Sequence, residues 1–281
     1  MSAYSNFETV KAEFIADHVL FVELNRPKKL NAFNPTQVFC AHNHTAREIF
    51  GVIKDDMNIR AVVLSASGRL FTAGLDLSES GLAITDGEGD VARGAFHRRR
   101  HIEDFQAAFT AIEQCDKPVI AAVHNGCFGA GVDMITACDI RYGTKDCFFC
   151  VKEVDVGLAA DVGTLQRLPK VIGNNSLVRE LCFTGRNLFA EEAMHCGLIN
   201  KVLASKEEVV AEAIKTAKLI ATKSPVAVLG TKRLLNYSRD HSVAEGLDYT
   251  VTWNAAMLNT EDIPRSMEAF VSKKPATYSK L

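Results

Sequence analysis

The middle of this chain repeats a unit of buried strand, glycine-containing loop and helix. The first strand is Ala61 to Ser65, and the loop Gly68 to Leu77 follows it. The second is Val119 to Val123, after which come the turn Gly126 to Gly131 and a predicted helix over Val132 to Cys138. Short apolar runs bounded by turn residues are typical of strands buried on both faces. The alternation therefore predicts an α/β fold.

The segments on either side of this unit extend the prediction. Glu8 to Phe14 and Val19 to Leu24 alternate apolar and polar residues around Asp17-His18, which predicts a β-hairpin. Apolar spacing of three and four predicts a series of C-terminal helices, over residues 209–222, 225–235, 243–258 and 262–271. We expect one core over residues 1–204 and a helical region over residues 205–281, whose helices are candidates for subunit contacts.

Three further segments have weaker signals. A helix is expected to begin at Asn34-Pro35, with asparagine as its cap and proline in its first turn. Helical periodicity also covers Ile102 to Ile112, and a short strand is expected over Ile140 to Tyr142. Residues 78–94 are rich in glycine and acidic side chains, so we expect a mobile segment that could lie over a pocket.

Composition excludes some classes of protein. The 281 residues are 47% hydrophobic and 23% charged, and no apolar run approaches the length of a membrane span. A formal net charge of -2 disfavours nucleic acid as the main partner, because surfaces that bind a phosphate backbone are usually strongly basic. The first residues lack the basic and apolar regions of a secretory signal, so the 8 cysteines are expected to be reduced.

Two motifs resemble metal sites but lack essential ligands. Cys147 and Cys150 form a single CxxC pair without a second pair or a neighbouring histidine, which favours thiols buried on a strand. His97 and His101 are four residues apart, but three arginines separate them where a zinc protease would have its glutamate. We interpret that segment as a solvated or anion-contacting face and predict no metal.

Three carboxylates stand on apolar segments of the middle of the chain. Glu153 and Asp161 lie in the stretch VKEVDVGLAADVGTLQRLP at 151–169, and Asp133 follows the glycine-rich turn. Buried charge is costly, so several acids in one apolar region indicate a catalytic pocket for acid/base chemistry. Structural roles remain open: Asp161 could cap the helix that begins after Gly163, and Asp133 could bond the turn that precedes it.

The last three residues, Ser279, Lys280 and Leu281, match a peroxisomal import signal. A polar segment, Ser272 to Tyr278, precedes them and is expected to be exposed. We therefore expect a peroxisomal import receptor as a partner and localisation in peroxisomes or a related microbody such as a glycosome.

Four segments together resemble the crotonase, or enoyl-CoA hydratase/isomerase, superfamily over nearly the whole chain. They are LNRPKKLNAF at 24–33, FTAGLDL at 71–77, KPVIAAVHNGCFGAGVDMITACDIRY at 117–142 and VGTLQRLPKVIG at 162–173. Their order and separation make the signal specific, although each alone would be weak. The resemblance implies a spiral of ββα units with a C-terminal helical trimerisation region, and assembly as a homotrimer or homohexamer.

The resemblance also implies an acyl-CoA substrate without a separate cofactor. The thioester oxygen would lie between the main-chain N–H groups of Leu75 and Ala130, which form an oxyanion hole that stabilises enolate charge. Ala130 stands where many relatives have glycine. The residues implied in binding the coenzyme A portion are Arg26, Lys28, Lys29, Leu30, Ala73, Asp76, Phe270 and Lys273, and the resemblance allows the last two to come from a neighbouring subunit.

The identity of the acids narrows the implied reaction. A hydratase of this family is expected to have glutamates at positions 133 and 153 and glycine at position 161, whereas this chain has Asp133, Glu153 and Asp161. That set is similar to the pattern of the Δ3,5-Δ2,4-dienoyl-CoA isomerase subgroup, in which Asp161 would be the base at C2, Glu153 the acid at C6 and Asp133 a supporting group. The alternatives are an enoyl-CoA hydratase, a Δ3,Δ2-enoyl-CoA isomerase, or a non-catalytic scaffold that binds CoA or RNA.

Overall fold

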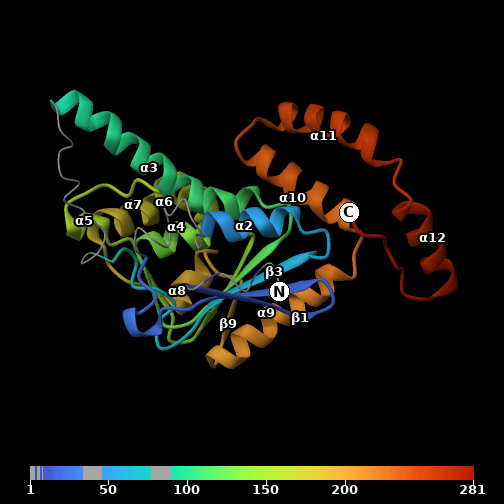
Figure 1. Cartoon of the computed structure of the whole chain (residues 1–281), viewed down its shortest axis with the longest axis horizontal. Coiled ribbons are helices and arrows are strands. Elements are labelled where there is room, and N and C mark those ends of the chain that lie inside the picture. The colour runs from blue at the N-terminus through green and yellow to red at the C-terminus, as the bar shows by residue number, and fades with distance from the viewer. Residues whose placement is uncertain (1–3, 5–6, 8, 34–45, 77–89) are drawn as a thin grey trace.

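The larger of two β-sheets forms the centre of the molecule (Figure 1). The computed structural model describes residues 4, 7, 9–33, 46–76 and 90–281. The six strands are, in their order across the sheet, β1 (Val10–Ala16), β2 (Val19–Leu24), β3 (Ala61–Ala66), β4 (Val119–Val123), β6 (Ile140–Thr144) and β9 (Lys201–Leu203). β1 and β2 pair antiparallel, which confirms the predicted hairpin, and the other neighbours pair parallel. The mixed α/β class is confirmed.

The alternation of side chains along β3 explains why its sequence is apolar except for Ser65. Ala61 and Val63 belong to the cluster that packs under helix α9 (Lys206–Ala221), while Val62 and Leu64 belong to the main core on the opposite face. Successive side chains of a strand point to opposite faces of its sheet. A strand that is covered on both faces therefore contains no position for a polar side chain on the solvent side.

The second, smaller sheet lies beside the start of helix α4 (Ala130–Thr136). Its strands are β5 (Gly126–Phe128), β7 (Phe148–Cys150) and β8 (Leu188–Phe189). The prediction of a turn over Gly126 to Gly131 is therefore wrong for its first three residues, which pair parallel with β7. Cys147 and Cys150 are buried free thiols at and next to β7, as the sequence indicated.

Helices cover both faces of the large sheet and extend beyond it at the C-terminus (Figure 1). The helices not yet given bounds are η1 (Pro27–Lys29, a 3-10 turn), α2 (Ala46–Asp55), α3 (Val91–Gln114), α5 (Glu153–Val156), α6 (Thr164–Ile172), α7 (Asn175–Thr184), α8 (Ala190–His195), α10 (Pro225–Arg239), α11 (Val243–Met257) and α12 (Asp262–Ser272). The four predicted C-terminal helices correspond to α9 through α12. α9 packs on the sheet, whereas α11 and α12 lie to one side of it.

Helix α3 is longer than the sequence predicted. Its N-cap, Asp90, accepts a hydrogen bond from the main-chain N–H of Arg93 at 3.0 Å. Residues 91–94, which the sequence placed in a segment rich in glycine and acids, are thus helical, and residues 77–89 of that segment lie outside the described residues. The predicted helix at Asn34-Pro35 also lies outside them. His97 is exposed and His101 partly exposed on α3, in keeping with a solvated face.

Among the described residues, no helix combines the length and the apolar character needed to cross a bilayer.

Replacing Phe109 by alanine is expected to lower the free energy of unfolding by about 3–5 kcal/mol, because Phe109 is fully buried and the change leaves a cavity. Its ring packs against Phe33 and Phe105 with centroids 5.7 and 5.8 Å away. Urea denaturation measures the loss. The control is Phe96→Ala, on the same helix at 66% exposure, which should change stability by no more than about 0.5 kcal/mol. Equal losses would contradict this packing.

Candidate active site

Main-chain hydrogen bonds join two loops at one edge of the large sheet. The loop after β2 contains Leu30 and Phe33, and the loop after β3 contains Ala73 and Asp76. Ala73 N donates to Leu30 O at 3.0 Å, and Asp76 N donates to Phe33 O at 2.7 Å. The carboxyl ends of parallel strands meet at the same edge of a sheet, which is where α/β proteins bind ligands. The hydrogen bonds hold the two loops in a fixed register at that edge.

The loop after β3 also pairs with the segment that leads into α4. Thr72 N donates to Gly126 O at 3.2 Å, and Phe128 N donates to Thr72 O at 3.1 Å. Gly74 has a φ of +81°, and a Cβ added there would lie 2.8 Å from Phe128 O. Position 74 therefore requires glycine for two reasons, the left-handed backbone and the close approach of the neighbouring chain.

Leu75 and Ala130 occupy adjoining parts of this arrangement. Ala130 is the first residue of α4, where a helix leaves its N–H groups without an intrahelical partner. In the part of the chain that the structure describes, no hydrogen bond uses the N–H of Leu75 or of Ala130. Neither N–H group therefore has an acceptor among the described residues.

Asp133 lies one turn into α4 and is fully buried. Its Oδ1 accepts a hydrogen bond from Thr164 N, the first residue of α6, at 2.5 Å. Asp133 thus supplies the cap of α6, and the alternative that Asp161 caps this helix is wrong. The alternative that Asp133 bonds the turn before α4 is also wrong, because its side chain bonds Thr164 instead. Burial raises the pKa of Asp133 to about 6, although the N–H of Thr164 opposes the rise.

Glu153 opens the short helix α5 beside the start of α4. A Cβ added at Gly129 would lie 3.4 Å from Glu153 Oε1, and Gly129 N donates to Cys150 O at 2.9 Å. Burial, which is the largest cause, and the nearby charges of Asp133 and Asp161 together raise the pKa of Glu153 to about 7. Glu153 Oε2 and Asp133 Oδ2 are both buried without a hydrogen-bond partner among the described residues. Such orphan oxygens are typical of a site that binds water or a ligand.

Asp161 lies in the turn before α6, partly exposed. Its main-chain oxygen accepts a hydrogen bond from Gln106 Nε2 on α3 at 2.7 Å. Because the charge of Asp161 acts on Glu153, the structure brings Asp133, Glu153 and Asp161 into one electrostatic cluster.

The other predicted site residues divide into two groups. Arg26 bonds Ala32 O at 2.6 Å and lies 3.6 Å from the Asp76 carboxylate, so both side chains tie the two loops together. Lys28 and Lys29 are exposed on η1, and Leu30 follows with a φ of +52°.

Phe270 and Lys273 are not near these loops within one chain. Phe270 lies on α12 and is 87% exposed, and Lys273 follows the end of that helix. Figure 1 shows α12 at the opposite end of the molecule from α5, which carries Glu153.

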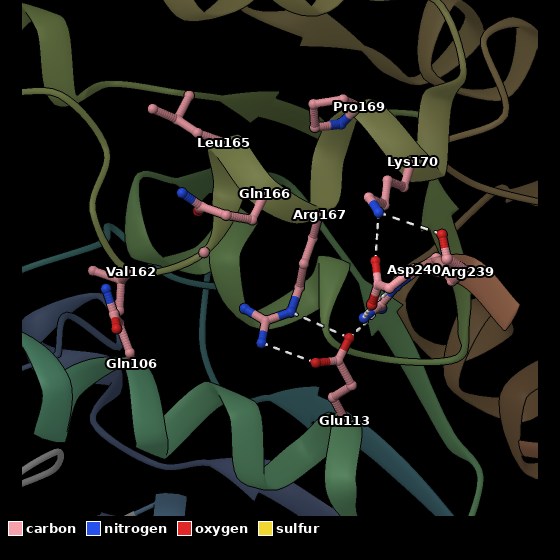
Figure 2. Close-up of a pocket in the computed structure, with 11 residues that line it drawn as sticks. Gln106, Glu113, Val162, Leu165, Gln166, Arg167, Pro169, Lys170, Arg239 and Asp240 are labelled. Carbon is pink, nitrogen blue, oxygen red and sulfur yellow. Dashed lines mark hydrogen bonds and ion pairs between the residues drawn. The ribbon is translucent and has the colours of Figure 1, made fainter. Parts of the chain in front are cut away.

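A pocket of about 780 Å³ adjoins the turn that carries Asp161 (Figure 2). Arg167 of α6 extends across it to Glu113 of α3, with Nη2 3.1 Å from Oε2. Although burial opposes ionisation, hydrogen bonds from Arg167 and Arg239 hold the pKa of Glu113 below its usual range. Sequence reasoning missed Gln106, Glu113 and Arg167. The seven-residue spacing of Gln106 and Glu113 places both side chains on one face of a helix, but nothing in the sequence indicates that this face contacts Asp161 and Arg167.

Among the described residues, no group of three or more histidine, cysteine, aspartate or glutamate side chains is arranged to hold a metal ion.

The whole chain matches known proteins of one class. Residues 15–280 match the family model described as enoyl-CoA hydratase/isomerase. The structure is similar to that of a putative enoyl-CoA hydratase from Streptomyces coelicolor, with a TM-score of 0.86, 27% identity and coverage of 99% of this chain and 97% of the other. An enoyl-CoA hydratase from Bacillus anthracis gives a TM-score of 0.84 at 25% identity, over 96% of this chain and 99% of the other. This chain belongs to the enoyl-CoA hydratase/isomerase family.

Relatives with higher identity share a more specific name. The protein named Delta(3,5)-Delta(2,4)-dienoyl-CoA isomerase, mitochondrial, from Rattus norvegicus is 52% identical over 280 residues, which cover 98% of this chain and 84% of the relative. The protein of the same name, but peroxisomal, from Arabidopsis thaliana is 40% identical over 283 residues, with coverage of 100% and 99%.

Stability should depend on pH through Glu153. Its pKa of about 7 in the folded state exceeds the ordinary 4.5, so the folded protein binds the proton more tightly than the unfolded chain. Stability should therefore rise as pH falls from about 8 to about 5, by on the order of 2 kcal/mol from this group. Urea denaturation at several pH values measures the rise. Glu153→Gln is the control, since it cannot titrate. Parallel curves for the two proteins would contradict the raised pKa.

Proposed function

We propose that this protein is a Δ3,5-Δ2,4-dienoyl-CoA isomerase that acts on unsaturated fatty acyl-CoA in β-oxidation. The observation that carries the proposal is the cluster of three acids in which the pKa of Glu153 is raised to about 7. The names of the relatives at 52% and 40% identity support the same reaction. No cofactor is required beyond the coenzyme A that the substrate carries.

The reaction moves two double bonds and requires two proton transfers. The C3=C4 and C5=C6 bonds become C2=C3 and C4=C5 when a base removes a proton from C2 and an acid adds one at C6. The two carbons lie at opposite ends of a conjugated system, so two separate carboxyl groups suit the reaction better than one. We assign Asp161 as the base and Glu153 as the acid.

Each carboxyl must begin in the correct protonation state. Glu153 has to hold a proton, and burial next to Asp133 and Asp161 provides for this near neutral pH. After one turnover Asp161 carries the proton from C2 and Glu153 has lost its own. Proton exchange with solvent restores both groups. The charge of Asp133, which Thr164 N holds in place, would add to the effect of burial in keeping Glu153 protonated.

The intermediate between the two proton transfers is a dienolate, which carries most of its negative charge on the thioester oxygen. We assign the N–H groups of Leu75 and Ala130 as its donors. Their lack of other partners among the described residues supports this assignment. One such preorganised donor can contribute about 3 kcal/mol to transition-state stabilisation.

Coenzyme A binding would use the loops around η1 and Ala73, together with α12 of a neighbouring subunit. Lys28 and Lys29 are exposed cations that could contact phosphate. Assembly as a homotrimer or homohexamer is supported by large apolar side chains that are exposed along the C-terminal helices, namely Val243, Leu247, Val251 and Leu258 of α11 and its end, and Met267, Phe270 and Val271 of α12.

Purified protein should convert a 3,5-dienoyl-CoA to the conjugated 2,4-product, which is followed as growing ultraviolet absorbance. Asp161→Asn and Glu153→Gln should each lower kcat by at least about 1,000-fold, because each removes one of the two proton-transfer groups. The control is Asp155→Asn, which changes an exposed acid of α5 and should leave kcat unchanged.

Two outcomes would contradict the proposal. Full turnover in both carboxyl variants would remove the assigned acid and base. Hydration of a 2-enoyl-CoA at a higher kcat/KM than dienoyl isomerisation, measured on the same preparation, would favour a hydratase.

A peroxisomal or related microbody location is the second part of the proposal, based on Ser279, Lys280 and Leu281. Deletion of Leu281 from a protein tagged at its N-terminus should abolish import, as seen by fluorescence microscopy. Lys274→Ala, which leaves the final tripeptide intact, is the control and should be imported normally. Unchanged import after the deletion, or accumulation in mitochondria as the name of the rat relative specifies, would contradict it.

A further inference from the structure

The turn that carries Asp161 is attached to the rest of the protein at both of its ends. At the first end, Gln106 Nε2 of α3 donates to Asp161 O at 2.7 Å. At the other, Thr164 N donates to Asp133 Oδ1 at 2.5 Å. The two hydrogen bonds come from different helices, α3 and α4, and fix the peptide groups on either side of residues 162 and 163.

The middle of the turn rests on a guanidinium group. Gly163 has a φ of +138°, and a Cβ added there would lie 2.0 Å from Arg167 Nη1, so the Arg167 side chain packs directly against the glycine. Arg167 Nη2 in turn donates to Thr110 Oγ1 and to Glu113 Oε2, each at 3.1 Å. Figure 2 shows Arg167 reaching from α6 to Glu113.

Gln106, Thr110 and Glu113 lie on one face of α3. Their separations of four and three residues place side chains on the same side of a helix. One face of a single helix therefore contacts Asp161 directly and, through Arg167, the glycine two residues later. The position of this turn relative to the core is set by α3.

From this arrangement we propose that Gln106 is a positioning residue for Asp161, a role that rests on the proposed function of Asp161 as a base. Gln106 is itself exposed, so its side chain is not part of the packed core. Its amide crosses to a main-chain oxygen 55 residues away in the chain. The contact orients the peptide group of Asp161, and with it the direction in which the carboxylate leaves the backbone.

Loss of this contact should affect the proton transfer more than substrate binding. A displacement of about 1 Å in a reacting group can lower a rate roughly 100-fold. Because Asp133 and Arg167 still hold the remainder of the turn, we expect Gln106→Ala to lower kcat about tenfold. KM should stay within about twofold, since the one side-chain hydrogen bond that Gln106 makes among the described residues goes to Asp161.

The test compares three single variants of the full chain with the natural protein. Gln106→Ala removes the donor, whereas Gln106→Glu keeps the size of the side chain and replaces its donor by an acid. An ionised carboxylate repels the Asp161 carbonyl oxygen, but a protonated one can donate to it. The kcat of Gln106→Glu relative to the natural protein should therefore rise several-fold as pH falls from about 7.5 to about 5. Gln166→Ala, an exposed glutamine that lines the same pocket, is the matched control.

Each outcome decides for or against the role of Gln106. A tenfold loss of kcat with unchanged KM, recovery of Gln106→Glu at low pH, and melting temperatures within about 3 °C of the natural protein would support it. Full kcat in Gln106→Ala, a loss seen only in KM, or an equal loss in Gln166→Ala would overturn it. If Asp161→Asn is inactive while Gln106→Ala is fully active, only this inference fails. An active Asp161→Asn would overturn the proposed function itself.

Discussion

The hydrogen bond between Asp133 Oδ1 and Thr164 N is the interaction on which the candidate site depends. It joins α4, whose first residue Ala130 is the proposed oxyanion donor, to α6, whose preceding turn carries Asp161. It also keeps a carboxyl group fully buried next to Glu153. A buried acid of this kind is costly unless its charge is compensated. The main-chain N–H of Thr164 compensates the charge on one oxygen of Asp133. The charge of Asp133 in turn favours the protonated form of Glu153.

The remaining geometry follows from main-chain pairing among loops. The loops after β2 and β3 bond to each other, the loop after β3 bonds to the start of β5, and Gly129 bonds to the end of β7. Because these contacts use peptide groups, they do not depend on the identity of the side chains at the edge of the sheet. Glycine is required at Gly74, where the loop after β3 passes close to the main chain of Phe128. These main-chain bonds fix the loops beside the three acids, of which Asp133 lies on α4, Glu153 on α5 and Asp161 in the turn before α6.

Much of the fold could be predicted because its strands are buried. β4 is a continuous apolar run, β3 is apolar except for Ser65, and the hairpin of β1 and β2 alternates as a half-buried pair should. The sequence does not predict the first half of α3, because apolar periodicity arises only where one face of a helix is buried. Val91 and Phe96 are 82% and 66% exposed, whereas Phe109 and Ile112 are fully buried. β5 was assigned to a turn, because three residues that begin with glycine give no strand signal.

The candidate site also has a part that the sequence predicts and a part that it does not. The three acids were identified from their apolar surroundings, but Asp133 was not paired with Thr164, because a cap from 31 residues away leaves no trace in local spacing. The contacts of Gln106 and Arg167 are also long-range and unpredictable from sequence.

The central claim is that Glu153 holds a proton near neutral pH, and a direct titration of its carboxyl group tests it. The measurement is a carbon-13 NMR titration of protein labelled at its glutamate carboxyl carbons, with Glu153→Gln used to assign the signal. We expect a midpoint near 7 for Glu153. A midpoint near 4.5, the ordinary value for glutamate, would contradict it.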